Sequence, residues 1–308
     1  MRPSILLIGS NGQVGHDLSE ILPRMAEVTA LDRTRLDLSR PDEIREVIRA
    51  SRPAWIVNAA AYTAVDNAES EEPLARAINA EAPRVMAEEA RKIGARLVHY
   101  STDYIFDGTK TKPYQEDDPA NPQNAYGRTK LEGESAIRES GADHLIFRTA
   151  WVYATRGRNF LLTILRLATQ REELRIVSDQ RGAPTLSSEI ARATSQIIEK
   201  ISRGEGGSSS GAAAGGTYHL TAGGETTWYN FAAAIVEHAK TASPALPWLA
   251  QATSNLAVIA RKITPISTRD YPTPARRPAY SVLSNTRLNR DFSVQLPDWR
   301  EQLDSLFQ

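Results

Sequence analysis

A tyrosine and a lysine stand four residues apart in the segment NAYGRTK, residues 124–130. On a helix this spacing places Tyr126 and Lys130 on one face, where the ammonium group is expected to lower the pKa of the phenol from its ordinary value of about 10. Such a tyrosine is a general acid for an alkoxide that forms when hydride reaches a carbonyl carbon. Thr102, in the segment HYSTDYIF, can donate a hydrogen bond to the same oxygen. Together the three residues predict a site for carbonyl reduction.

A glycine-rich segment with the pattern G-x-x-G-x-x-G occupies residues 9–15. Gly9 and Gly12 permit a tight turn and let the backbone approach a diphosphate, while Gly15 permits close packing of the next helix on the preceding strand. The N-terminus of that helix offers free N–H groups and a partial positive charge. The pattern predicts a binding site for a dinucleotide cofactor.

An acidic residue, Asp32, follows the second predicted strand about 20 positions after the glycine segment, where dinucleotide-binding folds place a group that accepts from the adenine ribose hydroxyls. The adjacent Arg33 can pair with a 2′-phosphate or stand as a solvated loop charge. Asp32 therefore favours NADH, Arg33 favours NADPH, and both cofactors stay open. Residues 58–63 have small side chains that would let the cofactor lie against the backbone.

Alternation of short apolar runs with amphipathic stretches indicates how these residues are positioned. Buried strands are predicted at 5–8, 28–31, 55–57, 97–100 and 145–147, and helices at 14–22, 41–50, 71–93 and 125–139, with Ser39 capping the second helix. Such alternation is typical of parallel strands with right-handed crossovers. We expect an α/β fold with a Rossmann-type doubly wound parallel sheet over residues 1–150.

The rhythm changes after residue 150 to longer helical stretches with isolated short strands at 174–177 and 217–220. Residues 151–308 are therefore expected to form mainly a smaller C-terminal substrate-binding lobe, with some segments returning to the Rossmann core. Residues 204–216 are rich in Gly, Ser and Ala and are expected to form a flexible surface loop. The proline-rich residues 271–278 should run extended.

The composition excludes several kinds of function. The 37 basic and 37 acidic side chains cancel, so no overall field attracts nucleic acid or an anionic membrane. The chain has no cysteine, which excludes disulfides, thiolate metal sites and cysteine nucleophiles and fits a cytoplasmic protein. The apolar run at residues 5–8 is far shorter than the roughly 20 residues of a membrane span.

Several stretches resemble the extended short-chain dehydrogenase/reductase family, and within it the dTDP-4-dehydrorhamnose reductases. They are GQVG (12–15), NAAAYTAVDNAE (58–69), STDYIFDG (101–108), YGRTK (126–130), RTAWVY (148–153), DQRGAPT (179–185), RRPAYSVLSNTRL (276–288) and LPDWREQL (296–303). The resemblance extends over nearly the whole chain. It implies a Rossmann fold with a Thr-Tyr-Lys catalytic set, which reduces the C4 ketone of dTDP-4-dehydro-β-L-rhamnose with NADPH or NADH in the last step of dTDP-L-rhamnose synthesis.

The resemblance also implies roles for particular residues. The cofactor contacts that it implies are Gly12, Gln13, Val14, Asp32, Asp37, Leu38, Ala61, Tyr62, Thr63, Tyr126 and Lys130, the last of which holds the nicotinamide ribose. The sugar contacts that it implies are Thr102, Asp103 and Trp151, with Tyr104 and Asp66 as neighbours. Arg276 and Arg277 either reach the substrate diphosphate or form a solvated pair.

Some relatives hold a magnesium ion between acidic residues at a dimer interface, and the matching positions here are Asp17, Glu189 and Glu301. Asp17 stands where a glutamate is expected, and Glu301 matches only with a shift of one residue. We therefore expect no essential metal, while a homodimer stays open.

Other functions use the same framework. A dehydratase would need an Asp-Glu pair after the threonine, but Asp103 is followed by Tyr104. A GDP-fucose synthase would need a cysteine. A nucleotide-sugar 4-epimerase keeps the same Thr-Tyr-Lys set and would carry tightly bound NAD. A non-catalytic subunit similar to the regulatory subunit of methionine adenosyltransferase would copurify with a synthetase and lack reductase activity.

Overall fold

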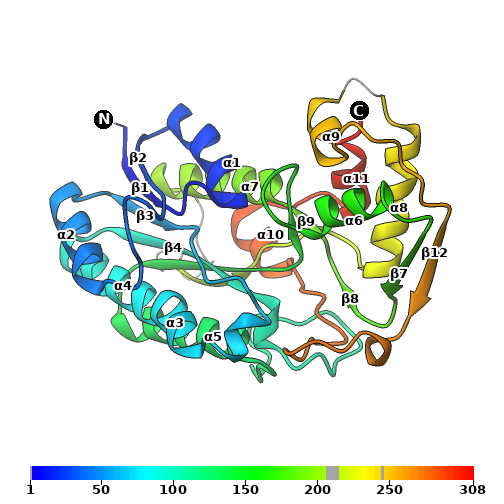
Figure 1. Ribbon diagram of the computed structural model, residues 1–308. Coiled ribbons are helices and arrows are strands. Elements are labelled where there is room, and N and C mark those ends of the chain that lie inside the picture. Colours follow the sequence, from blue (N-terminus) through cyan, green and yellow to red (C-terminus); the bar gives the residue numbers. More distant parts are fainter. Residues whose placement is uncertain (1, 206–214, 244–245) are drawn as a thin grey trace.

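A six-stranded parallel sheet forms the centre of the protein, for which a computed structural model describes residues 2–205, 215–243 and 246–308 (Figure 1). The strand order is β10-β5-β4-β3-β1-β2. The strands are β1 (Ser4–Ile8), β2 (Glu27–Leu31), β3 (Trp55–Asn58), β4 (Arg96–Thr102), β5 (His144–Thr149) and β10 (Gly216–His219). Every neighbouring pair is parallel, which confirms the predicted α/β doubly wound sheet.

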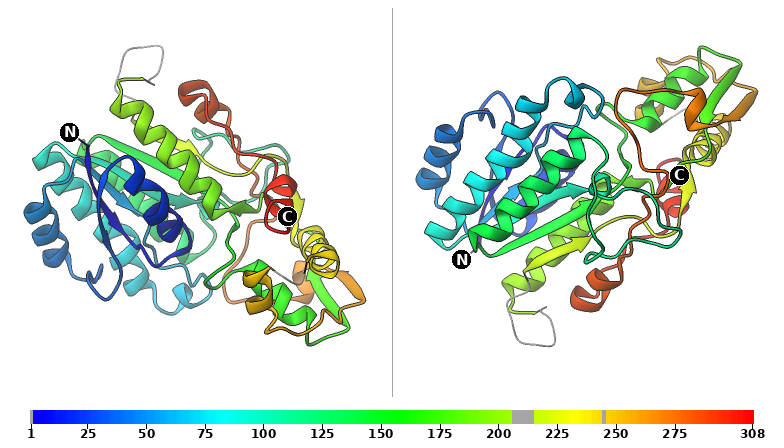
Figure 2. Two further views of the ribbon diagram at one scale, coloured as in Figure 1. Left: turned by 90° about the horizontal axis from the view of Figure 1, so that it is seen from above. Right: turned by 90° about the horizontal axis from the view of Figure 1, so that it is seen from below.

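Helices cover both faces of the sheet, which explains why the central strands are apolar on both sides. Helices α1 (Gln13–Ile21), α7 (Ser187–Ser202) and α10 (Thr286–Phe292) pack on one face. Helices α2 (Pro41–Ser51), α4 (Ala82–Ile93) and α5 (Ala125–Ser140) pack on the other (Figure 2). Leu6 and Leu7 of β1 alternate between the two cores and are both fully buried.

Two local predictions are corrected. Ser39 does not cap α2, which begins at Pro41 after Arg40 and has no side-chain cap. The Ser39 hydroxyl instead donates to Asp37 at 2.7 Å. Pro41 is the first helical residue, where its missing N–H removes one of the unpaired donors of the first turn.

The predicted helix at 71–93 is divided into three parts. They are α3 (Glu72–Arg76), a π-helical turn η3 (Ala77–Glu81) and α4. Asn79 lies in the π turn and is buried against the loop that follows β3. π turns interrupt helices mostly at functional sites, and this one adjoins the predicted cofactor segment.

The strand predicted at 217–220 belongs to the central sheet and is no isolated strand of the smaller lobe. It forms β10, which pairs in parallel with β5 in the register His219 opposite Arg148. Hydrogen bonding to an existing edge satisfies its backbone in a way that an isolated strand cannot. Most of the loop predicted at 204–216 lies outside the described residues, and Gly216 already belongs to β10.

A second hydrophobic core organises most of the remaining chain. It contains α6 (Phe160–Ala168), α8 (Trp228–Thr241), α9 (Pro247–Ala252), α11 (Trp299–Asp304) and the parallel pair β7 (Glu173–Val177) and β12 (Lys262–Ile266). Figure 1 shows this lobe beside the carboxyl ends of the central strands. Among the described helices none is long and apolar enough to cross a membrane.

The strand order defines where a ligand binds. β1 and β3 are neighbours, yet the chain continues from β1 toward one edge of the sheet and from β3 toward the other. Loops that leave their carboxyl ends diverge and open a crevice, which is the usual ligand site of doubly wound sheets. The glycine segment follows β1, and residues 58–63 follow β3, so both predicted cofactor segments lie at this switch point.

A buried ion pair fastens α5 to the sheet. The guanidinium of Arg148, on β5, donates to both carboxylate oxygens of Glu134, on α5, at 2.7 and 3.0 Å. Burial disfavours the carboxylate, but the hydrogen bonds and charge of Arg148 outweigh it and lower the pKa of Glu134. Both groups therefore stay charged although both side chains are buried.

We expect Glu134→Gln to lower the free energy of unfolding by about 3 kcal/mol, because it leaves the guanidinium of Arg148 buried without a countercharge. The matched control is Glu132→Gln on the same helix, which breaks only a partly exposed ion pair with Arg76 and should cost at most about 1 kcal/mol. Urea unfolding of the two variants measures the difference. Equal losses would show that the buried pair does not stabilise α5.

Candidate active site

The glycine segment between β1 and α1 is shaped by steric limits at two positions. Gly9 has a φ of +87°, and a Cβ there would lie 2.7 Å from the backbone nitrogen of Ala60. A Cβ on Gly15 would lie 2.0 Å from the carbonyl oxygen of Gly9. Both positions therefore require glycine, as the spacing predicts.

Helix α1 points its N-terminus at this crevice. Gly12 is the N-cap residue and has no side chain to satisfy the first-turn N–H groups of Gln13 and Val14. Free N–H groups at a helix N-terminus bind an anion such as the diphosphate of a dinucleotide. The residues present thus fit that group.

Asp32 lies at the rim of the crevice, directly after β2. Its carboxylate accepts from the Thr34 hydroxyl at 2.6 Å and from the Asn11 amide at 2.6 Å, and these bonds, with Thr34 first, lower the pKa of Asp32. The group is therefore ionised at neutral pH and accepts hydrogen bonds. The neighbouring Arg33 is exposed.

Asp37 and Leu38 lie farther along the same loop. The backbone N–H and hydroxyl of Ser39 donate to Asp37 and lower its pKa, while Leu38 is buried in the core below. Asp37 is thus held ionised in a local turn.

The segment after β3 is held by Asn79 from the π turn. The Asn79 side chain accepts from the Tyr62 N–H at 2.9 Å and donates to the Tyr62 carbonyl at 3.1 Å. The Tyr62 hydroxyl donates to Glu71 at 2.5 Å, which raises the pKa of Tyr62 to about 12. Ala61 is partly exposed and Thr63 is exposed, so this segment offers backbone and small side chains to a ligand.

Asn124 holds the N-terminus of the helix that carries Tyr126. Its side-chain oxygen accepts from the Gly127 N–H at 2.8 Å, and its amide nitrogen donates to the Arg276 carbonyl at 2.7 Å. Glu69 accepts from the N–H of Ala125 at 2.7 Å. The sequence analysis did not identify this cap, although an asparagine before a helix is a recognised signal.

Tyr126 lies beside Thr102 and Tyr104. Its ring meets that of Tyr104 edge-on at 5.6 Å, and burial raises the pKa of Tyr126 to about 12, against the opposing effect of a hydrogen bond with Thr102. The expectation that Lys130 lowers this pKa is wrong for the protein alone, because burial dominates and the amino group of Lys130 is directed elsewhere. Tyr126 is consequently protonated at neutral pH, as an acid must be.

The amino group of Lys130 is buried between α5 and β4. Nζ donates to the carbonyl oxygen of Tyr100 at 2.6 Å and lies 3.1 Å from Nε2 of His99. Burial lowers the pKa of Lys130 to about 7, although the charge of Glu134 acts in the opposite direction. His99 is a neighbour to which the sequence analysis gave no role.

Thr102 is the last residue of β4, Asp103 begins the 3-10 turn that follows it, and both are buried. The Thr102 hydroxyl donates to Asp103 at 3.0 Å and accepts from the Tyr104 N–H at 3.2 Å. Burial raises the pKa of Asp103 to about 6 and also raises that of Tyr104. Four residues expected to contact the sugar or its keto oxygen therefore lie together: Thr102, Asp103, Tyr104 and Tyr126.

Trp151 lies shortly after β5, where the chain passes toward the second lobe. Its ring stacks on Trp228 of α8 with centroids 3.5 Å apart and planes 6° apart. Its backbone has a φ of +49°, which costs a non-glycine residue conformational energy that surrounding packing must offset. A Cβ on Gly182 would lie 2.4 Å from the Trp151 ring, so this glycine makes room for the tryptophan.

Asp66 and Arg277 form an ion pair with each other. The guanidinium donates to both carboxylate oxygens at 2.8 and 3.0 Å and holds segment 271–278, which has bends at 271, 274 and 275, beside the loop after β3. Hydrogen bonds from Arg277 lower the pKa of Asp66. Of the two arginines considered for the substrate diphosphate, only Arg276 has an exposed side chain.

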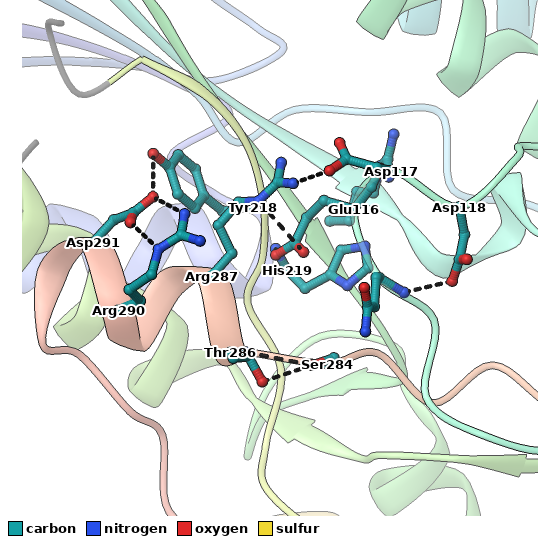
Figure 3. A network of polar contacts seen from close by, with 12 residues as sticks. Glu116, Asp117, Asp118, Tyr218, His219, Ser284, Thr286, Arg287, Arg290 and Asp291 are labelled. Atoms are coloured by element: carbon teal, nitrogen blue, oxygen red, sulfur yellow. Dashed lines mark hydrogen bonds and ion pairs between the residues drawn. The ribbon is translucent and has the colours of Figure 1, made fainter. Parts of the chain in front are cut away.

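A polar network anchors the long connection from β4 to α5 (Figure 3). The carboxylate of Glu116 accepts from the His219 N–H at 3.1 Å and lies 3.8 Å from the Arg287 guanidinium, which also pairs with Asp117. Arg148 donates to the Glu116 carbonyl at 2.9 Å. The connection that leads into the catalytic helix is therefore tied to β5, β10 and α10.

The acidic residues considered for magnesium have other contacts. Asp17 accepts from Ser187, and Glu189 pairs with Arg192 at 2.6 Å, while Glu301 is exposed on α11. Over residues 2–205, 215–243 and 246–308, no group of three or more His, Cys, Asp or Glu side chains is arranged to hold a metal ion.

A phosphate-binding helix at the switch point and a Thr-Tyr-Lys set at the carboxyl ends of the strands define a dinucleotide-dependent oxidoreductase of the short-chain dehydrogenase/reductase type. The family described as RmlD substrate binding domain matches residues 1–308. The chain belongs to this family.

Three similar proteins carry the same enzyme name. It is 48% identical over 296 residues to the dTDP-4-dehydrorhamnose reductase of Burkholderia thailandensis, covering 96% of this chain and 95% of the relative. It is 42% identical to the enzyme of the same name from Escherichia coli K12, covering 99% and 98%. The crystal structure of dTDP-4-dehydrorhamnose reductase from Bacillus anthracis in complex with NADP superimposes with a TM-score of 0.85 at 33% identity, covering 100% of this chain and 99% of that one.

Asp32 and Arg33, at the rim of the crevice, are expected to set the preference between NADH and NADPH. We expect Asp32→Ala to weaken binding of NADH by roughly tenfold, because an acceptor for the ribose hydroxyls is lost, while binding of NADPH is unchanged or tighter. Arg33→Ala should weaken NADPH alone. Fluorescence titration with each dinucleotide measures both, and parallel losses for the two cofactors in either variant would contradict this assignment.

Proposed function

We propose that this protein reduces the C4 keto group of dTDP-4-dehydro-β-L-rhamnose to dTDP-L-rhamnose with NADPH or NADH, in the last step of dTDP-L-rhamnose synthesis. The observation that supports this most directly is the protonated Tyr126 beside Thr102 at the carboxyl end of the sheet. The phosphate-binding segment lies at the same edge. The named activity of the relatives supports the choice of sugar.

NADPH or NADH, when bound, supplies the hydride that reaches C4. In our proposal the first turn of α1 binds the diphosphate, and Gly9, Gly12 and Gly15 allow the turn and the helix to pack closely beneath it. Asp32 and Arg33 meet the adenine ribose, with Asp37 and Leu38 beside them. Gln13, Val14 and the backbone of residues 61–63 line the remaining path, and Lys130 holds the nicotinamide ribose.

Tyr126 is the general acid in this reaction. As negative charge develops on the C4 oxygen, the phenol donates its proton to that oxygen. Thr102 positions the same oxygen by a hydrogen bond, for which its hydroxyl turns away from Asp103. A positive charge on Lys130 would favour the tyrosinate that remains if its amino group turned from the Tyr100 carbonyl toward the nicotinamide ribose.

The sugar lies between the carboxyl end of the sheet and the second lobe. Asp103 and Tyr104 face it from the end of β4, and Trp151 faces it from the connection between the lobes. Asp66 acts on this site through Arg277, whose bidentate pair positions segment 271–278. Arg276 then offers its exposed guanidinium to the dTDP diphosphate.

We expect Tyr126→Phe to lower kcat by about 10²- to 10⁴-fold, because the proton donor is removed while the ring remains. Absorbance of NADPH and NADH is followed separately with dTDP-4-dehydrorhamnose generated in situ from dTDP-glucose. Dinucleotide affinity, measured by fluorescence, should stay within about threefold of the parent protein. Unchanged turnover in this variant would refute the assigned acid, and no oxidation by the parent protein would refute the assigned sugar.

Activity should not require a divalent metal ion, because the acidic residues considered for one are already engaged by Ser187 and Arg192 or exposed singly. We expect turnover after dialysis against EDTA to remain within about twofold of the untreated protein. Addition of magnesium serves as the control. Complete loss on chelation, with recovery on adding magnesium, would contradict the expectation.

A further inference from the structure

Lys130 has a second neighbour besides the Tyr100 carbonyl. Its Nζ lies 3.1 Å from Nε2 of His99, on the same strand as Thr102. Both side chains are fully buried. Among the described residues, the lysine nitrogen therefore has two hydrogen-bond partners, the Tyr100 carbonyl and this imidazole.

The other side of the imidazole faces Asn58, at the carboxyl end of β3. Nδ1 of His99 lies 3.0 Å from Nδ2 of Asn58, and Oδ1 of Asn58 accepts from the N–H of Ala60 at 3.2 Å. Asn58 is also fully buried. A continuous chain of hydrogen bonds thus joins Lys130 to the segment after β3, against which the cofactor is expected to lie.

Hydrogen-bond chemistry links this chain to the charge of Lys130. An ammonium group only donates, so a charged Lys130 requires that Nε2 of His99 accept and that Nδ1 carry the proton. Nδ1 must then donate to the oxygen of the Asn58 amide. In the arrangement observed, Asn58 donates to Nδ1 instead, which places the imidazole proton on Nε2 and fits an uncharged amine at Lys130.

A half-turn of the Asn58 amide converts one arrangement into the other. It would exchange the hydrogen bond from Ala60 for one from the His99 imidazole. The orientation of the Asn58 amide therefore depends both on the protonation of Lys130, through His99, and on the Ala60 N–H at the border of the cofactor crevice.

The other polar groups near Lys130 have hydrogen-bond or ion-pair partners of their own, or are uncharged. From its own helix, Glu134 favours the ammonium form, but its carboxylate is bound by Arg148. The π turn contributes the uncharged Asn79, which bonds to Thr129 beside the lysine. Burial lowers the pKa of His99 well below its ordinary value, with the charge of Lys130 adding to that effect, so His99 acts as a neutral imidazole.

We propose that His99 is a positioning residue for this reductase: its imidazole holds Nζ of Lys130 and, through Asn58, sets how readily that nitrogen carries a proton. The proposal rests on the function assigned above. Once the Asn58 amide has turned, Nε2 of His99 supplies the acceptor that lets an ammonium group exist at this buried position. Without it, the lysine would hold the ribose and assist Tyr126 only at lower pH.

The test compares the pH dependence of NADPH binding in the parent protein, His99→Leu and His99→Gln. Affinity should fall as the pH rises through the pKa of Lys130. In His99→Leu the ammonium loses an acceptor, so the fall should occur about one pH unit lower and leave binding about tenfold weaker than the parent above that range. His99→Gln keeps an acceptor near the place of Nε2 and should follow the parent within about twofold.

Thr194→Val is the matched control, since it breaks a buried hydrogen bond with Tyr100 on the other face of β4 and leaves the lysine untouched. It should lower the melting temperature without moving the pH curve. If His99→Leu does not fold, His99→Phe keeps a planar ring but also lacks the Nε2 acceptor and should move the curve in the same direction.

A uniform loss of affinity with an unmoved pH curve in His99→Leu would overturn the proposal, as would a His99→Gln variant that shifts as far as His99→Leu. Because the titration contains no sugar, its outcome is independent of whether the sugar assigned above is correct. The pH dependence of kcat with the sugar then checks whether the same shift reaches catalysis.

Discussion

The close approach of α5 to its neighbours is the constraint on which the site depends. A Cβ on Gly127 would lie 2.2 Å from the Tyr104 carbonyl, and a Cβ on Gly133 would lie 2.1 Å from the Asn79 carbonyl. These two glycines let the helix pack directly against the end of β4 and the π turn. Tyr126 and Lys130 reach Thr102 and the Tyr100 carbonyl only because no larger side chain keeps the helix away.

Burial follows from that approach and determines the electrostatics of the site. It raises the pKa of Tyr126 and Asp103 and lowers that of Lys130, so the neutral form of each group is favoured. The Glu134–Arg148 pair is the exception, because each charge satisfies the other. Among these groups Tyr126 stays protonated at neutral pH, whereas Asp103 and Lys130 are brought closer to titration there.

In the proposed function both lobes contact the substrate. The end of β4 and the turn that follows it carry Thr102, Asp103 and Tyr104, whereas Trp151 is held by a stack with Trp228 from the second lobe. Segment 271–278 lies beside the loop after β3, where Arg277 is fixed by Asp66. Side chains more than 200 positions apart in the sequence are therefore in direct contact, so a change in this segment can reach the loop after β3.

The sequence by itself determined the elements and motifs that depend on local order. Periodicity predicted the five strands and the helices of the first half, and spacing predicted the glycine turn and the Tyr126–Lys130 pair, because backbone preferences and helix geometry act over a few residues. Only the tertiary structure decided what depends on long-range contact: the place of β10 in the central sheet, the pairing of Asp66 with Arg277, and the direction of the Tyr126 pKa. All three depend on which groups become buried and which partners they meet, and residues close in the sequence do not reveal either. The contact between His99 and Lys130 is of the same kind, because it forms only after β4 and α5 have packed together.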